Sequence, residues 1–95
     1  MRPQKVEHKE LMEGLLLVLR AKGYDGASLS DLATATGLKK ASLYHRFPGG
    51  KQQMTEAVLE YVAEWVDTNI FAVLIDQTQP ANERLNLALQ NIDTL

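Results

Sequence analysis

Several basic side chains lie near the middle of the chain, in a stretch that contains no carboxylate. Residues 38–54 include no Asp or Glu, and their basic members are Lys39, Lys40, His45, Arg46 and Lys51. Ammonium and guanidinium groups that lie together without acidic neighbours attract polyanions. The chemistry that this stretch offers is therefore phosphate binding, as on a nucleic-acid backbone.

The net charge of the whole chain, −2, conceals a strong asymmetry. Residues 1–51 contain 9 basic and 5 acidic residues, a net of +4, whereas residues 52–95 contain 1 basic and 7 acidic residues, a net of −6. One part of the chain therefore suits a polyanionic partner and the other does not. The slightly acidic total does not argue against nucleic-acid binding.

A short helix that ends in a turn is predicted immediately before the basic stretch. Ser28 has a side chain suited to a helix N-cap, and Asp31 follows three residues later, as in a capping box with a short acidic arm. Leu29 and Leu32 then recur at helical spacing. Gly37 is expected to end this helix, because glycine adopts positive φ without steric cost.

The basic residues belong to a second predicted helix, over residues 39–47. Leu43 and Phe47 are four residues apart and therefore face inward together. Two short helices joined by a tight turn form a helix-turn-helix, whose second helix enters the major groove of DNA. The same pattern can be a plain corner between two packed helices, but a second helix with basic and no acidic residues favours DNA binding.

The remaining apolar pattern predicts an all-α fold. A three-helix bundle that includes the helix-turn-helix is followed by a long connecting helix and by the start of a further helix. The first helix is expected over residues 5–22, after Pro3 and before Gly23. Its predicted buried stripe consists of Met12, Leu15, Leu16 and Leu19.

The long helix is predicted from Lys51 to about Ile75, and the last helix from Pro80 onward. The apolar positions of the long helix cover more than one of its faces, so it is expected to pack against two surfaces. These positions are Met54, Val58, Tyr61, Val62, Trp65 and Val66. The last helix carries an apolar stripe of Leu85, Ala88, Leu89, Ile92 and Leu95. Because this stripe is still continuing at Leu95, we expect the sequence to be cut from a longer protein.

The helix-turn-helix resembles that of a known family. The run from Gly37 to Phe47 reads GLKKASLYHRF and is similar to the DNA-binding domain of tetracycline-repressor-type (TetR/AcrR) transcriptional regulators. A Gly-Tyr pair at 23–24 is similar to the family's glycine–aromatic end of helix 1, and a Leu-Ala pair at 32–33 to its helix 2. The resemblance covers roughly residues 8–66 and rests on several spaced positions.

The resemblance implies roles for individual residues in binding double-stranded DNA. Ser28 and Ser30 should donate hydrogen bonds to phosphate at a helix N-terminus, where the helix dipole favours anions. The start of the second helix should contact base edges through Lys39, Lys40, Ala41 and Ser42. The DNA backbone should be held by Tyr44, His45, Arg46 and Lys51.

Some of these assignments have alternatives in the sequence. Tyr44 could be a half-buried core residue, and His45 and Arg46 could be solvated surface. Lys51 follows Phe47 after three residues, whereas two are common in the family. An extra glycine in this turn could be absorbed by backbone flexibility.

By resemblance, the whole protein is a sequence-specific transcriptional regulator. The resemblance implies a ligand-responsive repressor that binds a palindromic DNA operator as a homodimer, in the cytoplasm and associated with the nucleoid. Residues 1–66 would be the DNA-binding domain, and residues 67–95 the beginning of a truncated C-terminal domain for ligand binding and dimerisation. The sequence identifies neither the small-molecule effector nor the residues that bind it. The alternative is a helical protein-interaction module that keeps the fold and binds a protein through the acidic face of the long helix.

Other functions have little support. The chain contains no cysteine, no phosphate-binding P-loop and no Gly-x-Ser-x-Gly motif, so neither an enzyme nor a cofactor is expected. No segment reaches the roughly 18 apolar residues of a membrane span. Glu56, Glu60 and Glu64 share one helix face, but no histidine joins them, so a solvated face is favoured over a metal site. Trp65 is expected to serve packing rather than ligand recognition.

Overall fold

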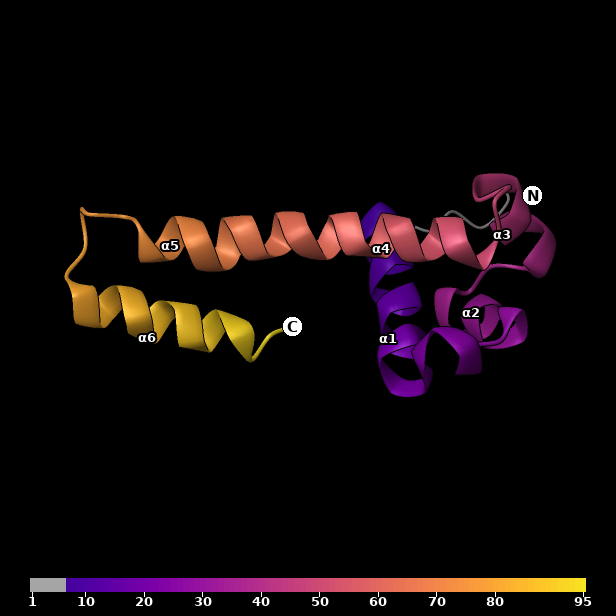
Figure 1. Cartoon of the computed structure of the whole chain (residues 1–95), viewed down its shortest axis with the longest axis horizontal. Coiled ribbons are helices and arrows are strands. Elements are labelled where there is room, and N and C mark those ends of the chain that lie inside the picture. The colour runs from indigo at the N-terminus through magenta and orange to yellow at the C-terminus, as the bar shows by residue number, and fades with distance from the viewer. Residues whose placement is uncertain (1–6) are drawn as a thin grey trace. The chain divides into compact units, whose positions relative to one another are not determined.

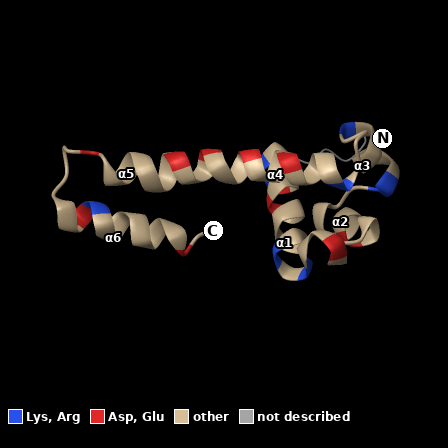
Figure 2. Cartoon of the chain, viewed as in Figure 1, with Lys and Arg blue, Asp and Glu red and all other residues tan. Residues whose placement is uncertain are grey.

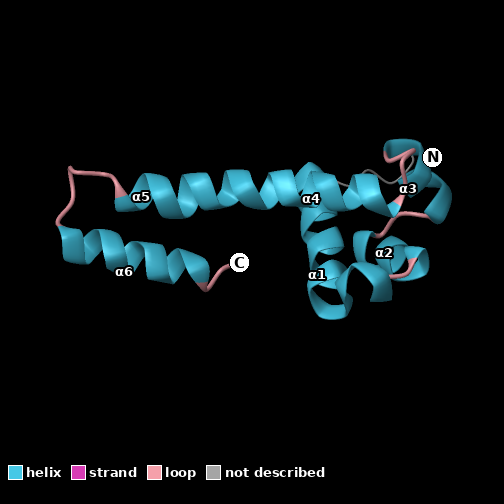
Figure 3. Ribbon diagram, in the orientation of Figure 1, coloured by secondary structure: helices cyan, strands magenta, loops and turns pink. Residues whose placement is uncertain are grey.

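The computed structural model describes residues 7–95, which form helices joined by short loops and contain no strand (Figure 3). The all-α prediction is thereby confirmed. The described residues fall into two compact units, one that ends at Leu59 and one over Glu60–Leu95. Figure 1 gives the order of the helices along the chain.

The first unit contains α1 (His8–Gly26), α2 (Leu29–Thr36), α3 (Lys40–Arg46) and the beginning of α4 (Lys51–Val66). Its core is made of the apolar side chains of Leu11, Met12, Leu15, Val18, Ala27, Leu32, Leu43, Phe47, Met54 and Val58. The four helices therefore share one hydrophobic core, which holds the helix-turn-helix in place.

The predicted stripe of α1 is partly confirmed. Met12 and Leu15 are completely buried, whereas Leu16 and Leu19 are only half-buried. Leu11 and Val18, which were not assigned to the stripe, are buried as well, so the buried face is wider on one side than predicted. The predicted start of this helix, at residue 5, lies outside the described residues.

Gly23 interrupts α1 where the sequence placed the end of the first helix. Its φ of 74° and ψ of 173° are not helical, and the chain resumes helical geometry only for the short stretch up to Gly26. The amide of Ala27 then donates to the carbonyl of Gly23 at 3.1 Å. The break redirects the chain toward α2, and only glycine adopts such a φ at little cost.

α1 and α2 approach each other closely at Gly14. A Cβ atom at this position would lie 2.7 Å from the carbonyl oxygen of Ala35 and 3.2 Å from the Cα of Thr36. The Thr36 side chain is itself buried, and its hydroxyl donates to the carbonyl oxygen of Leu32 at 2.9 Å. The absence of a side chain at Gly14 therefore sets the distance between these two helices.

The second unit contains the end of α4, the π-helical segment η1 (Asp67–Phe71), α5 (Ala72–Leu74) and α6 (Ala81–Ile92). Helical structure thus runs without a break from Lys51 to Leu74, which agrees with the prediction of one long helix. The π-helical segment was not predicted. Inside it, the side-chain amide of Asn69 donates to the carbonyl of Trp65 at 2.9 Å, and the side-chain amide of Asn91 in α6 donates to the carbonyl of Asn69 at 2.7 Å.

α6 packs on η1 and α5 with Ala88, the one buried member of its predicted apolar stripe, and with polar residues beside it. Ala88 is the buried residue of α6, and Arg84 and Asn91 flank it at helical spacing. In contrast, Leu85 and Leu89 are more than half exposed. A small residue such as alanine lets two helices approach closely, which explains why it faces the contact.

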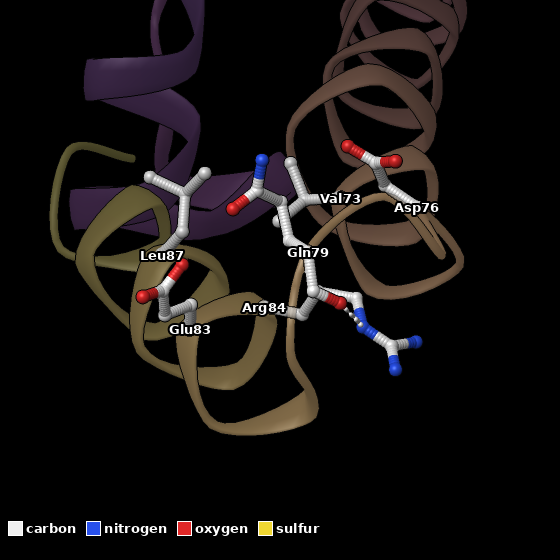
Figure 4. Close-up of a pocket in the computed structure, with 6 residues that line it drawn as sticks. All are labelled: Val73, Asp76, Gln79, Glu83, Arg84 and Leu87. Carbon is white, nitrogen blue, oxygen red and sulfur yellow. Dashed lines mark hydrogen bonds between the residues drawn. The ribbon is translucent and has the colours of Figure 1, made fainter.

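The connection between α5 and α6 is held by Arg84. Its Nε donates to the carbonyl of Gln79 at 3.0 Å, and its Nη1 donates to the carbonyl of Leu74 at 2.9 Å. Beside this connection lies an open cavity of about 380 Å³ (Figure 4), lined by Val73, Asp76, Gln79, Glu83, Arg84 and Leu87.

Candidate nucleic-acid interface

α3 is attached to the core by very little of its surface. Leu43 is the one buried residue among the seven of this helix, and Phe47, which follows it as the C-cap, is buried too. Both were predicted to face inward, and both predictions are confirmed. The other six residues of α3 are exposed: Lys40, Ala41, Ser42, Tyr44, His45 and Arg46. The helix therefore presents almost its whole circumference to a partner.

The polar side chains of this helix are not used within the fold. Lys39 is the N-cap residue of α3 but makes no capping hydrogen bond with its side chain. Six side chains of α3 and its N-cap make no hydrogen bond or ion pair with any residue from 7 to 95. They are those of Lys39, Lys40, Ser42, Tyr44, His45 and Arg46. Figure 2 shows the basic positions at α3. Cations without an internal counter-charge remain available to an external anion.

The N-terminus of α2 carries the predicted capping box. The amide of Asp31 donates to the Ser28 hydroxyl oxygen at 3.0 Å, and the amide of Ser28 donates to the Asp31 carboxylate at 3.3 Å. The Ser28 amide is thus engaged internally. Ser30 is exposed, and its hydroxyl has no partner among the described residues. At the other end of α2, Gly37 has the predicted positive φ, of 73°.

Asp31 also binds the side chain of Lys22, whose Nζ lies 3.0 Å from the carboxylate. This hydrogen bond, followed by those from Ser28, lowers the pKa of Asp31 below its ordinary value. Hydrogen bonds and a nearby cation both favour the charged carboxylate. The ionised form of Asp31 therefore stabilises the start of α2.

A carboxyl group whose pKa is lowered on folding stabilises the native state above its unfolded-state pKa, near 4. This stabilisation is lost as the pH falls through the lower, folded-state pKa. We therefore expect Asp31→Asn to lower the free energy of unfolding at pH 7, and the difference from the native chain to shrink toward pH 3. Asp25→Asn, at an exposed residue without a partner among those described, is the control. Urea unfolding followed by circular dichroism measures both, and a difference for Asp31→Asn that is equal at the two pH values would contradict this prediction.

The turn between α3 and α4 accommodates all three residues before Lys51. The amide of Gly50 donates to the carbonyl of Phe47 at 2.8 Å, and Gly50 has a φ of 73°. The amide of Gly49 donates to the side-chain oxygen of Gln53 at 2.7 Å. A Cβ at Gly50 would lie 3.7 Å from the ring of Tyr44, so the tyrosine side chain lies near this turn.

Lys51 is directed toward the connection between α1 and α2. Its Nζ donates to the carbonyl of Ala27 at 3.2 Å and lies 4.6 Å from the centre of the Tyr24 ring. The side chain is half-buried, unlike those of the basic residues on α3. The sequence does not connect Tyr24 with Lys51, because these residues come together only in the folded chain.

Other kinds of site have no support among the described residues. Residues 7–95 contain no group of three His, Asp or Glu side chains that could hold a metal ion. Over the same residues, none of the helices has the length and apolar character needed to cross a bilayer. Glu56, Glu60 and Glu64 are all exposed on α4.

Comparison with known proteins agrees with this geometry. The family model described as "Bacterial regulatory proteins, tetR family" matches residues 11–58. The HTH-type transcriptional regulator LmrA of Bacillus subtilis is 27% identical over 73 residues, which are 77% of this chain and 39% of that protein. The nucleoid occlusion factor SlmA of Photobacterium profundum is 31% identical over 85 residues, 88% of this chain and 42% of that protein.

A third relative is the biofilm operon icaADBC HTH-type negative transcriptional regulator IcaR of Staphylococcus aureus. It is 35% identical over 49 residues, which are 52% of this chain and 26% of that protein. The chain thus spans less than half the length of these relatives, and no solved structure matches it significantly. Because the family match covers residues 11–58, which include the complete helix-turn-helix, the chain belongs to the tetR family of bacterial regulatory proteins.

Proposed function

We propose that this chain is the DNA-binding part of a transcriptional regulator and that α3 enters the major groove of its operator. The observation that carries the proposal is the exposure of α3, whose polar side chains have no partner among residues 7–95. An unpaired basic helix at the surface of a helix-turn-helix matches the electrostatic and geometric requirements of groove binding. The names of LmrA and IcaR, both HTH-type regulators, support the same function.

Within this proposal, phosphate contacts set the register and α3 reads base edges. Phosphate would be bound by Ser28, Ser30, Tyr44, His45 and Arg46. Base edges would be contacted by Lys39, Lys40, Ala41 and Ser42. Lys40 could pair with O6 and N7 of a guanine, and Ala41 or Ser42 could touch a thymine methyl group. The exposure of each of these residues supports the assignment.

The wider function follows from family membership and is part of the proposal. The protein would act as a homodimer on a palindromic operator, with half-sites about one helical turn, roughly 34–36 Å, apart. Residues 1–66 would form the DNA-binding domain, and residues 67–95 would begin a C-terminal domain for dimerisation and for a small effector. The protein would be cytoplasmic and would repress transcription, in keeping with the name of IcaR as a negative transcriptional regulator.

Two substitutions separate base reading from backbone contact. Lys40→Ala should change the preferred base at one position of the half-site and cost about 1–3 kcal/mol on the preferred sequence. Tyr44→Phe removes a single hydroxyl group and should weaken binding to all sequences by a similar factor. Selection of bound duplexes from a random pool, followed by fluorescence anisotropy, measures both effects.

Equal and sequence-independent losses for the two variants would show that Lys40 contacts the backbone and not a base. A helical protein-interaction module would behave differently again. It would bind no duplex at any salt concentration, and neither substitution would have an effect.

A further inference from the structure

The contact of Lys51 with Ala27 and Tyr24 joins two parts of the chain that are far apart in sequence. Lys51 is the first residue of α4, and Ala27 immediately precedes the N-cap residue of α2. Ala27 is almost completely buried, at 1% exposure, so its carbonyl has little access to water. The Lys51 ammonium supplies the hydrogen bond that this carbonyl needs, at 3.2 Å.

The second half of the contact is a cation–π interaction. The Lys51 ammonium lies 4.6 Å from the centre of the Tyr24 ring, within the range in which the ring face attracts a cation. Tyr24 directly follows the break in α1 at Gly23, so its ring belongs to the segment that leads into α2. Hydrogen bond and ring together hold one ammonium group between two elements.

These two elements carry the proposed phosphate contacts. Ser28 and Ser30 follow Ala27 directly, at the start of α2. On the other side, the ring of Tyr44 lies near Gly50, the residue next to Lys51, because a Cβ added at Gly50 would be 3.7 Å from that ring. The Lys51 contact therefore connects the two phosphate-binding segments on either side of α3.

We propose that Lys51 is a positioning residue for DNA binding, and not itself a phosphate ligand. By holding the carbonyl of Ala27 and the ring of Tyr24, it fixes the start of α2 relative to the turn between α3 and α4. The phosphate ligands at the start of α2 and those beside the turn between α3 and α4 are then held at a fixed distance from each other. This inference rests on the proposed function, because it explains how the residues assigned to DNA are aligned.

The salt dependence of binding distinguishes positioning from direct contact. Each phosphate neutralised by a cation contributes about 0.9 to the slope of log K against log[salt]. Lys51→Met should therefore weaken binding by about 3- to 10-fold, the size expected for loss of a cation–π contact and one hydrogen bond, and leave the slope unchanged. Arg46→Met, at a proposed phosphate ligand, is the positive control and should make the slope shallower by about 0.9.

Tyr24 supplies the matched partner variant. Tyr24→Leu should weaken binding by a similar factor. The double variant, Lys51→Met with Tyr24→Leu, should bind no more weakly than the single variant with the lower affinity, because both changes remove one shared contact. Lys51→Arg should restore most of the affinity, since a guanidinium also donates to a carbonyl and stacks on a ring. A role in stability alone would lower the melting temperature and leave the affinity of the folded variants unchanged.

The experiment uses the 95-residue chain. The probe is a fluorescein-labelled duplex of about 30 base pairs selected from a random pool, which is long enough for two half-sites one helical turn apart. Anisotropy is measured between about 50 and 200 mM salt, at a temperature where circular dichroism shows every variant to be folded.

Backbone amide shifts of Ser28 to Ser30 in the DNA-free chain give a readout that does not depend on the proposed function. They should move in Lys51→Met and in Tyr24→Leu and return in Lys51→Arg. A slope shallower by about 0.9 in Lys51→Met, additive losses in the double variant, or unchanged amide shifts would overturn the inference. Absence of DNA binding by the native chain would instead overturn the proposed function, and the amide shifts would still decide whether Lys51 holds the start of α2.

Discussion

A chain in which Lys39, Lys40 and Arg46 are all replaced by glutamine is expected to lose about 10²- to 10³-fold in DNA affinity at 0.1 M salt. The three side chains are exposed and have no partner among the described residues, so their replacement should leave the fold intact. If each of these cations displaces about one condensed counterion from the DNA, whether its side chain ends at a base edge or at a phosphate, the slope of log K against log[salt] should become shallower by about 2.7. Anisotropy titrations at several salt concentrations give both quantities.

Lys9→Gln is the control for a simple change in net charge. Lys9 lies on α1 and pairs with Glu13 at 3.9 Å, and its side chain is 79% exposed. Its replacement should leave the salt slope as in the native chain. A triple variant that keeps the native slope would show that these three cations do not contact the DNA.

The second large effect concerns stability. Gly14→Ala places a methyl group where the nearest atoms are the backbone of Ala35 and Thr36, at 2.7 to 3.2 Å. Backbone in a packed helix cannot move aside as a side chain can, so α1 and α2 must separate. We expect a loss of about 1–3 kcal/mol in the free energy of unfolding. For a domain of this size, each kcal/mol corresponds to roughly 4–8 °C in melting temperature.

Gly26→Ala is the matched control, since both glycines lie within the bounds of α1. A Cβ at Gly26 meets nothing closer than the Cβ of Lys22, at 3.5 Å, which is ordinary contact. Its effect should be close to neutral. Equal melting temperatures for the two variants would contradict the close approach of α1 and α2 at Gly14.

Features of this fold that depend on neighbours in sequence were predictable. The capping box of Ser28 and Asp31 and the positive φ of Gly37 follow from residue type and from a spacing of three or fewer. The inward side chains of Leu43 and Phe47 follow from helical periodicity. The exposed basic face of α3 is the complement of that pattern, and so the candidate interface was largely visible in the sequence.

Features that depend on distant parts of the chain were not predictable. In the sequence, Gly14 is only a glycine with low helix propensity within a helix, and its packing role becomes apparent when the backbone of α2 is placed against it. Lys51 carries the same charge as its neighbours in sequence, but its ammonium meets the carbonyl of Ala27, 24 residues away. No residue pattern distinguishes it from the cations of α3, because the difference is made by the chain segment it faces.

The second unit shows the same limit. Only Ala88 of the predicted apolar stripe of α6 is buried, and the hydrogen bonds to α5 and η1 come from the polar residues Arg84 and Asn91. The π-helical segment Asp67–Phe71 interrupts the α-helical hydrogen-bond pattern of the long helix, and the side-chain amide of Asn91 donates to the carbonyl of Asn69 within it. Apolar periodicity does not show which face of a helix packs against its neighbour through small residues. It also does not show where a helical turn gains an extra residue and becomes π-helical.

The central claim, that Lys39 and the exposed cations of α3 bind DNA, is tested most directly by the salt dependence of binding by the native chain. The titration uses the 95-residue chain and a labelled duplex selected from a random pool. The three cations Lys39, Lys40 and Arg46 predict a slope of about −3 for each bound copy of the chain, in a plot of log K against log[salt]. A slope near zero, or no binding at low salt, would contradict the claim.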